Sequence, residues 1–388
     1  MKNKLSDICT YRNGKVDIKD LNTETYISTE NMLPNKGGIT EAASLPTVSF
    51  TQEYKKGDVL VSNIRPYFKK IWRAKNDGGC SNDVLVFQAN ENIDKEFLYY
   101  VLANDDFFAY SMATSKGTKM PRGDKFSIMQ YEVPNFDLET QRKIAAVLSA
   151  LDDKIELNNK INENLEQQAQ AIFKSWFVDF EPFGGKMPAE WRMGTIADLG
   201  IVVGGGTPSK KVTEYYTDNG IAWITPKDLS NDKSKFISHG QTDISDLGLA
   251  KSGATLMPKG TVLFSSRAPI GYIAIANGQV TTNQGFKSVV PFENVGTAYV
   301  YCFLKNNLSA IENVASGSTF KEVSGNTMKN FAALIPANDT LAKFQRFFTP
   351  IFEQQCVLEC ENARLSALRD TLLPKLMNGE IDVSEVKV

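Results

Sequence analysis

Histidine is almost absent from this chain: only His239 occurs among 388 residues. Most zinc hydrolases bind their metal through several histidines, so the sequence excludes that class of catalyst for the chain by itself. His239 lies in a polar stretch, residues 235–243, with no Ser or Cys nucleophile motif beside it. We therefore interpret it as a surface-loop residue and not as a catalytic base.

Cysteine is also sparse, and the five cysteines are odd in number and scattered, which is not the pattern of a disulfide framework. Cys356 and Cys360 lie close together on a predicted helix, but no third Cys or His is near enough to complete a metal site. Apolar runs stay short of the ~18 residues of a membrane span, and the first residues lack the apolar core of a signal peptide. We expect a cytoplasmic protein with reduced thiols and no bound metal.

Motifs that bind nucleotides or carry out catalysis are missing as well. The glycine-rich run GGGTPSKK at residues 204–211 superficially suggests a phosphate-binding loop, but it lacks the Gly-Lys-Ser/Thr of a P-loop at the required spacing. No G-x-G-x-x-G opens a helix after a strand, no Asn-Pro-Pro-Tyr methyltransferase motif occurs, and no convincing nuclease cluster of carboxylates and lysine is present. The sequence indicates a chain without catalytic residues or cofactors of its own.

Charge of one sign is not in excess, since 43 Lys and Arg oppose 45 Asp and Glu for a formal net charge of −2. Contact with nucleic acid would therefore have to come from local clusters of cations. Such clusters occur at corresponding places in the two halves of the chain, although a solvated surface role is an equally simple interpretation for each residue. The candidate DNA-binding residues are Lys69, Lys70, Lys116, Lys119, Arg122 and Lys125 in the first half, and Lys210, Arg267, Ser318, Thr319 and Lys321 in the second.

An internal repeat at a spacing of about 200 residues organises the chain. In each half, short β-branched and aromatic runs are followed by short apolar helices, a proline and one long helix. We predict an α/β (α+β) fold. The matching segments are 26–32 with 223–229, 56–62 with 259–265, and 114–118 with 314–318. The predicted segments are a first domain at 1–138, a helix at 139–181, a second domain at 182–340, and a C-terminal helix with its tail at 341–388.

The two long helices carry apolar residues at alternating spacings of three and four, which is typical of a coiled-coil seam. Asn162 and Leu165 in the first helix correspond to Asn362 and Leu365 in the second. Asparagines inside a seam cost stability and fix register or partner choice, so we predict that these four residues contribute to pairing between the helices. The alternative is that each helix packs only on its own domain.

Four aromatic residues share one face near the end of the first long helix: Phe173, Trp176, Phe177 and Phe180. Packing into the core of the chain is the simpler interpretation of this face. The alternative, for which these residues are candidates, is a surface that docks a partner protein.

The segment at 141–180, QRKIAAVLSALDDKIELNNKINENLEQQAQAIFKSWFVDF, resembles the central helical region of specificity subunits of bacterial type I restriction–modification enzymes. GGGTPSK, IAWITPKDL, LFSSRAPIGYIAIA, TTNQGFKSVVP and SGSTFKEVS resemble a target-recognition domain of that family, and ENARLSALRDTLLPKLMNGEI resembles its C-terminal helix. Residues 1–138 match more loosely, as expected if the two domains read different DNA sequences.

The resemblance implies a non-catalytic subunit that reads a bipartite site in double-stranded DNA, with one domain per half-site. It implies binding to two modification subunits, which methylate adenine with S-adenosylmethionine, and to restriction subunits, which are motor-nucleases that use ATP and Mg²⁺. It also implies an antiparallel coiled coil with pseudo-twofold symmetry. Two other functions stay open: a coiled-coil adaptor that binds only proteins and, despite the missing motifs, a fused methyltransferase–nuclease.

Overall fold

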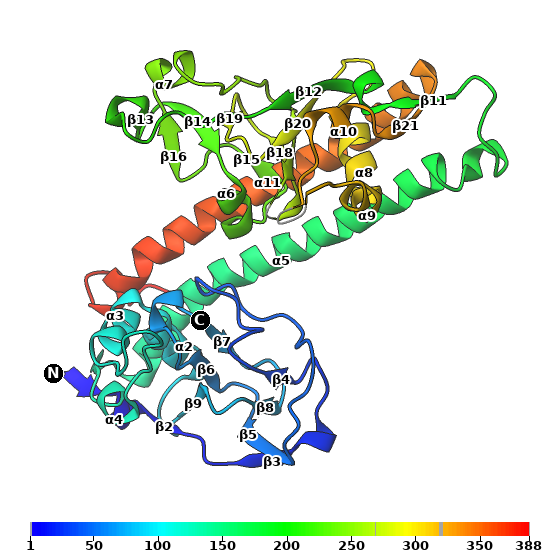
Figure 1. Cartoon of the computed structure of the whole chain (residues 1–388). Helices are drawn as coiled ribbons and strands as arrows, with labels where there is room; N and C mark the ends of the chain where they lie inside the picture. Colours follow the sequence, from blue (N-terminus) through cyan, green and yellow to red (C-terminus); the bar gives the residue numbers. More distant parts are fainter. Residues whose placement is uncertain (1, 268, 318–320, 388) are drawn as a thin grey trace. The chain divides into compact units, whose positions relative to one another are not determined.

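The computed structural model describes residues 2–267, 269–317 and 321–387. The chain divides into two compact units (Figure 1): unit 1 contains Met1–Glu156 and Ala363–Val388, and unit 2 contains Leu157–Asn362. Both boundaries fall inside long helices, because α5 spans Leu138–Phe177 and α11 spans Asn338–Met377. Each unit therefore includes a part of both helices, whereas the sequence predicted the helices as separate segments.

Unit 1 contains two four-stranded sheets. The strands are β2 (Cys9–Tyr11), β3 (Lys15–Asp17), β4 (Tyr26–Ile27), β5 (Phe50–Tyr54), β6 (Val59–Ser62), β7 (Ile71–Arg73), β8 (Gly78–Cys80) and β9 (Val84–Ala89). The sheet whose strands are longer in total is antiparallel, with the order β2-β9-β6-β7, and we call it the larger sheet. The smaller sheet has the order β3-β5-β8-β4, and its β4–β8 pair is parallel. A separate strand pair joins β1 (Lys2–Lys4) to β10 (Glu132–Pro134).

Alternation of side chains along the strands gives the larger sheet of unit 1 two buried faces. Val59 and Val61 of β6 belong to a core shared with helices, whereas Leu60 belongs to a core shared with the smaller sheet. Unit 1 thus has three layers: helices, sheet and smaller sheet. Its short helices are α1 (Leu5–Ile8), α2 (Lys95–Ala103), α3 (Asp105–Ala113) and α4 (Lys125–Ile128).

Unit 2 repeats this plan. Its strands are β11 (Arg192–Thr195), β12 (Gly200–Gly204), β13 (Tyr216–Thr217), β14 (Ile221–Ile224), β15 (Phe236–Ile237), β16 (Thr242–Ile244), β17 (Val262–Ser266), β18 (Ile270–Ala276), β19 (Thr281–Thr282), β20 (Lys287–Pro291) and β21 (Ala332–Ile335). Its short helices are α6 (Pro226–Asn231), α7 (Asp246–Ala250), α8 (Thr297–Asn306), α9 (Leu308–Asn313) and α10 (Gly325–Lys329). The larger sheet has the order β12-β20-β17-β18-β15, the smaller sheet has the order β13-β16-β14-β19, and β11 pairs with β21.

The backbone pairing supports the sequence repeat. In unit 1, Ile27 of β4 lies opposite Cys80 of the parallel strand β8, and in unit 2 Ile224 of β14 lies opposite Thr282 of the parallel strand β19. The units differ in the strand added to this pair, because β5 joins at β8 in unit 1 whereas β16 joins at β14 in unit 2. The two smaller sheets therefore share the parallel strand pair and differ in the strand beside it.

The long helices stop at backbone features that the apolar pattern does not show. Helix α5 ends at Phe177, short of the predicted end, and Phe180 has a left-handed backbone with φ 54°. Helix α11 ends at Met377, and Gly379 has φ +71°, a conformation that glycine adopts without strain. Among the residues described, no helix is long and apolar enough to cross a membrane.

The aromatic face near the end of α5 lies in the core of unit 2. The rings of Phe173 and Phe177 are buried and contact Tyr299 of α8 and Phe344 of α11. Trp176 and Phe180 are partly buried and pack against the same core. Partner docking is therefore wrong for Phe173 and Phe177, because their rings already fill the space between α5, α8 and α11.

Two neighbouring phenylalanines of α11 provide a matched test of this core. Phe348 is fully buried and stacks on Phe344 with ring centres 4.0 Å apart, whereas Phe347 is 60% exposed. Phe348→Ala should lower the free energy of unfolding by about 3–5 kcal/mol, because it removes a buried ring and leaves a cavity. Phe347→Ala should change it by less than about 0.5 kcal/mol. Denaturant unfolding of both variants measures the difference, and equal effects would contradict this packing.

Candidate nucleic-acid interface

The cationic loop of unit 1, residues 114–125, is a folded hairpin that we call flap 1. Lys116 and Arg122 exchange two backbone hydrogen bonds, each with N···O 2.9 Å. The Gly123 N–H donates to the carbonyl oxygen of Asn63, just beyond the end of β6, with N···O 3.1 Å. Flap 1 is thus hydrogen-bonded to the chain just beyond the end of β6, a central strand of the larger sheet.

Two of the predicted cations in flap 1 are already paired with carboxylates. The Lys116 ammonium lies 2.6 Å from Asp124, and this contact, with the Ser127 N–H, lowers the pKa of Asp124 to about 2. The Arg122 guanidinium lies 3.1 Å from Asp83. Both cations are exposed, so each can still face solvent, but part of its charge is neutralised within unit 1.

Lys119 and Lys125 are the most available cations of flap 1. Both side chains are exposed, and Lys119 forms no ion pair with any residue in the described part of the chain. The Lys125 ammonium lies 5.8 Å from the ring centre of Tyr11, within the range of a cation–π contact at an exposed site.

The predicted pair Lys69 and Lys70 separates in the structure. The Lys69 ammonium lies 2.8 Å from Asp105 and stays partly exposed. The Lys70 ammonium donates to the carbonyl oxygen of Thr29, with N···O 2.6 Å, and burial lowers its pKa. Lys70 therefore has an internal partner, which makes it the less suited of the two to contact a phosphate.

Unit 2 carries an equivalent hairpin, flap 2, whose described residues are 314–317 and 321–324. Ser316 and Glu322 exchange backbone hydrogen bonds of 3.1 and 2.8 Å, and the Val323 N–H donates to the carbonyl oxygen of Ser266 at the end of β17, 2.9 Å away. These bonds match those of flap 1. Lys321 is exposed, and the predicted Ser318 and Thr319 lie outside the described residues.

The charge at the base of the flaps is opposite in the two units. Glu322 occupies the position that Arg122 has in flap 1, and its carboxylate lies 3.9 Å from Arg267 and 3.5 Å from Lys287. Arg267, predicted to contact DNA, lies beside flap 2 and is partly neutralised by Glu322. The described parts of the two flaps share backbone hydrogen bonds and present different side chains.

The glycine-rich run of unit 2 is needed for close packing of the backbone. A Cβ at Gly205 would lie 1.9 Å from the carbonyl oxygen of Asn283, and one at Gly206 would lie 2.2 Å from the carbonyl carbon of Gly253. Only glycine fits at these two positions. Lys210 follows this packed segment and is exposed.

The middle of the helix pair is polar. In unit 2, the amide of Asn158 is buried and donates to Asn362 Oδ1 at 2.9 Å and to Glu361 Oε2 at 2.8 Å. The amide of Asn362 donates to Asn159 Oδ1 at 2.8 Å. The predicted residue Asn362 thus lies at the helix contact, but its partners are Asn158 and Asn159.

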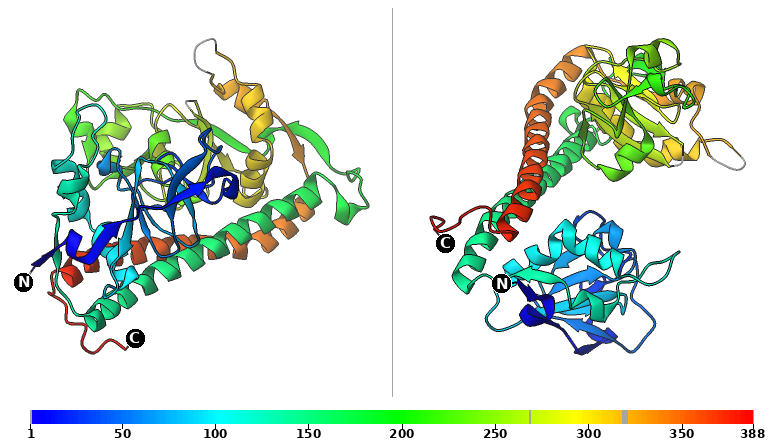
Figure 2. Two further views of the ribbon diagram at one scale, coloured as in Figure 1. Left: turned by 90° about the horizontal axis from the view of Figure 1, so that it is seen from below. Right: turned by 90° about the vertical axis from the view of Figure 1, so that its left-hand side faces the viewer.

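The next contact along the seam shows the direction of the helices. Asn162 lies opposite Gln355, whose side-chain amide donates to the Asn162 carbonyl oxygen at 3.1 Å. Partners in α11 therefore decrease in number as those in α5 increase, so within unit 2 the helices run side by side in opposite directions (Figure 2). Leu165 and Leu365 are half-buried; Leu165 lies in unit 2 and Leu365 in unit 1.

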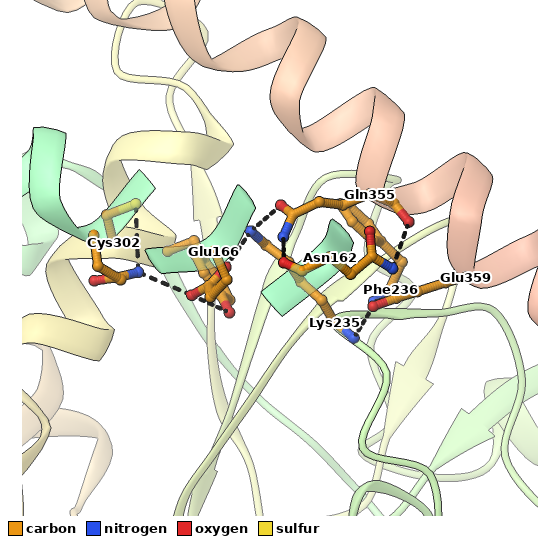
Figure 3. A network of polar contacts seen from close by, with 9 residues as sticks. Asn162, Glu166, Lys235, Phe236, Cys302, Gln355 and Glu359 are labelled. Carbon is orange, nitrogen blue, oxygen red and sulfur yellow. Dashed lines mark hydrogen bonds and ion pairs between the residues drawn. The ribbon is translucent and has the colours of Figure 1, made fainter. Parts of the chain in front are cut away.

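A buried lysine connects the helix pair to the larger sheet of unit 2 (Figure 3). Lys235, just before β15, is 8% exposed, and its ammonium lies 2.8 Å from Glu166 of α5 and 2.8 Å from Gln355 of α11. The same ammonium lies 3.4 Å from the ring centre of Phe352 and 4.3 Å from that of Tyr301. One side chain thus contacts both helices and two aromatic rings.

The electrostatics of this network follow from burial and pairing. Burial lowers the pKa of Lys235, and the nearby Glu166 carboxylate opposes this effect. Burial also opposes ionisation of Glu166, but Lys235, Gln170 and Lys305 together outweigh it, so the pKa of Glu166 is lower than usual. Glu359 accepts the backbone N–H groups of Lys235 and Phe236 at 2.9 and 3.0 Å. Sequence reasoning missed this network, because a lysine in a polar stretch carries no signal of burial.

The remaining polar candidates do not form a reactive site. His239 is exposed and lies 3.3 Å from Asp243. All five cysteines are free thiols, and three of them, Cys9, Cys80 and Cys302, are buried. Among the described residues, no group of three or more His, Cys, Asp or Glu side chains could hold a metal ion.

The chain is similar to known proteins of one family. The family described as "Type I restriction modification DNA specificity domain" matches residues 1–167 and 188–354. The chain is 29% identical to the HindI specificity subunit of Haemophilus influenzae, over 97% of this chain and 98% of that subunit. It is 39% identical to the MjaIX specificity subunit of Methanocaldococcus jannaschii, over 43% and 39% of the two chains. The crystal structure of a type I S subunit from M. genitalium has a similar fold, with TM-score 0.59, 16% identity and coverage of 97% and 96%.

The Lys235–Glu166 pair can be tested by separating it. Glu166→Gln leaves the buried ammonium without its counter-charge and should lower the free energy of unfolding by about 3 kcal/mol, at the low end for a buried pair because a quarter of Glu166 is exposed. The double variant Glu166→Gln/Lys235→Met should lose less than the sum of the two single variants. Lys174→Ala breaks the exposed ion pair between Lys174 of α5 and Asp179. It should lower the free energy of unfolding by at most about 1 kcal/mol. Urea unfolding of the four variants would contradict the coupling if their effects were additive.

Proposed function

Because the chain belongs to the family of type I restriction–modification DNA specificity domains, we propose that it selects the DNA sequence on which such an enzyme acts. The family matches twice, once over each recognition domain. The observation that carries the proposal is the pair of flaps. In each unit a polar hairpin is hydrogen-bonded at the end of a corresponding strand of the larger sheet, β6 in unit 1 and β17 in unit 2. The chain is a DNA-recognition subunit and not an enzyme by itself.

Each unit would read one half of a bipartite site in double-stranded DNA. Cations such as Lys119 and Lys125 suit phosphate contacts, which position a protein on the duplex. Glu322 with Arg267 offers an acceptor and a donor, which are the groups that distinguish base edges in the major groove. Because the two flaps carry different side chains, the two half-sites should have different sequences.

The chain would act inside a larger assembly. Specificity subunits join other subunits of the restriction–modification system. We infer that two modification subunits bind this chain and supply S-adenosylmethionine-dependent adenine methylation, and that restriction subunits supply ATP- and Mg²⁺-dependent translocation and cleavage. Cofactors would then be held by those partners, and the assembly would work in the cytoplasm, where the DNA is found.

Methylome sequencing tests this function directly. Cells that express this chain with a modification subunit should methylate adenine within one bipartite sequence, because the chain provides the sequence choice and the partner provides the chemistry. Cells that express the modification subunit alone are the control and should show no methylation at that sequence. The same methylation pattern with and without the chain would contradict the proposal.

The cations of flap 1 provide a quantitative prediction for the assembled complex. Replacing Lys119, Arg122 and Lys125 by Ala should weaken binding to every DNA sequence. It should also reduce the slope of log affinity against log salt by about 0.9 for each phosphate that no longer has a cation beside it.

A control variant with the same change in charge replaces Lys15, Lys19 and Lys56, three exposed lysines of unit 1 outside the flap. It should keep the salt slope of the original protein. DNA-binding titrations at several salt concentrations measure both variants, and equal slopes for the two variants would remove flap 1 from the interface.

A further inference from the structure

The turn between β6 and β7 of unit 1 exposes two neighbouring aromatic rings. Tyr67 is 49% exposed and Phe68 is 37% exposed, and their ring centres lie 4.7 Å apart. Pro66 beneath them is buried and anchors the turn. Two adjacent exposed rings form a small apolar surface, which is a candidate contact for a binding partner.

The backbone of this turn is held in an uncommon conformation. Arg65 and Lys69, on either side of the aromatic pair, have left-handed backbones with φ 52° and 50°. A residue other than glycine is strained there, and Arg65 is restricted further because it precedes a proline. Such strain persists only where surrounding contacts enforce it, and it is concentrated at functional sites.

Backbone hydrogen bonds from two other loops enforce the conformation. The Asn35 N–H donates to the carbonyl oxygen of Phe68, and the Lys36 N–H donates to that of Lys69, each with N···O 2.8 Å. From the other side, the Arg65 N–H donates to the carbonyl oxygen of Pro121 in flap 1, also at 2.8 Å. The backbone that carries the aromatic pair is therefore held by hydrogen bonds on both sides, and the turn is bonded to flap 1.

Three lysines lie near the exposed rings, and each already has a partner within unit 1. Lys36 and Lys69 both pair with Asp105, at 2.9 and 2.8 Å. The Lys70 ammonium lies 5.8 Å from the ring centre of Phe68. The available cations are those of the adjoining flap 1, where Lys119 and Lys125 are exposed. Exposed rings beside such cations suit nucleic acid, because bases stack on aromatic faces while cations contact the phosphates.

Unit 2 has no matching aromatic pair in the described part of its β17–β18 turn. Arg267 follows β17, and Ile270 already begins β18, so the position of Tyr67 is taken by an aliphatic strand residue. The aromatic pair is therefore a property of unit 1, and its effect on DNA should be confined to one half-site.

We propose that Tyr67 and Phe68 stack on bases of the half-site read by unit 1 and open a base step there, so that they contribute to the choice of sequence. This inference rests on the proposed function. Opening a base step costs less at flexible pyrimidine–purine steps than at stiff ones, so an aromatic wedge favours some sequences without a hydrogen bond to any base.

The test uses the complex of this chain with its modification subunit and DNA carrying the fluorescent base 2-aminopurine at successive positions of each half-site. The original complex should raise the fluorescence, which reports unstacking, at a position in one half-site only. Tyr67→Ala/Phe68→Ala should abolish this increase and weaken binding about 5- to 150-fold, the range for loss of base stacking. Tyr67→Phe should keep both, because the stacking face is retained.

Phe50→Ala is the matched control, since Phe50 is a 59% exposed aromatic residue of β5 in the same unit. It should leave fluorescence and affinity unchanged. Thermal unfolding checks the fold, and Tyr67→Ala alone replaces the double variant if the latter does not fold.

The two proposals fail in different ways. If the original complex selects a bipartite sequence but the Tyr67 and Phe68 variants keep its affinity, its fluorescence signal and its half-sites, the stacking inference is overturned and the proposed function stands. If the original complex shows no sequence choice, the proposed function itself fails. Methylome sequencing of the double variant should show relaxed bases in one half-site and unchanged bases in the other.

Discussion

Both units depend on one constraint: α5 and α11 must lie side by side, because the core on the helix-covered side of each larger sheet includes residues of both helices. In unit 1, Leu148 of α5 and Leu376 of α11 belong to the same buried core. In unit 2, Phe173 and Phe344 do so from the other parts of these helices. It follows that unit 1 cannot complete its core until residues 363–388 have been synthesised, although its sheets come from the beginning of the chain.

Apolar packing alone would not fix how two long helices align, because apolar residues recur every three or four positions and a shifted pair would also bury them. The polar contacts remove this ambiguity. Asn158 meets Asn362 and Asn162 meets Gln355 only in one alignment, and any shift would leave buried amides without partners. Lys235 then ties the sheet of unit 2 to this alignment, since its ammonium needs groups from both helices. A buried ion pair adds little net stability, so we infer that its main contribution here is to favour one arrangement of the sheet and the helices.

The sequence predicted the order of strands and helices better than it predicted which residues contact one another. Repeated strands, short helices and one long helix per half were visible because each follows from local patterns of apolar residues, Gly and Pro. The helix ends were missed by a few residues, since the left-handed backbone at Phe180 leaves no mark in the apolar pattern. From the sequence, the aromatic face at Phe173 and Phe177 could be either part of the core or a surface for a partner protein. The spacing shows that a helix face is apolar, but it does not show what covers that face. The burial of Lys235 depends on residues distant in sequence, and no local pattern reveals such neighbours.

The predicted interface residues show the same limit on a finer scale. Sequence placed cations in two equivalent loops, and the structure shows that these loops are hairpins with the same backbone bonds. It could not show that Arg122 in one unit corresponds to Glu322 in the other, or that each is paired with an opposite charge on the adjoining loop or strand. Several flap side chains, among them Lys119, Lys125 and Lys321, are exposed and outside the cores, so they can change without loss of the fold. A repeated scaffold whose flaps differ in their side chains is therefore consistent with the proposal that the two units read different half-sites.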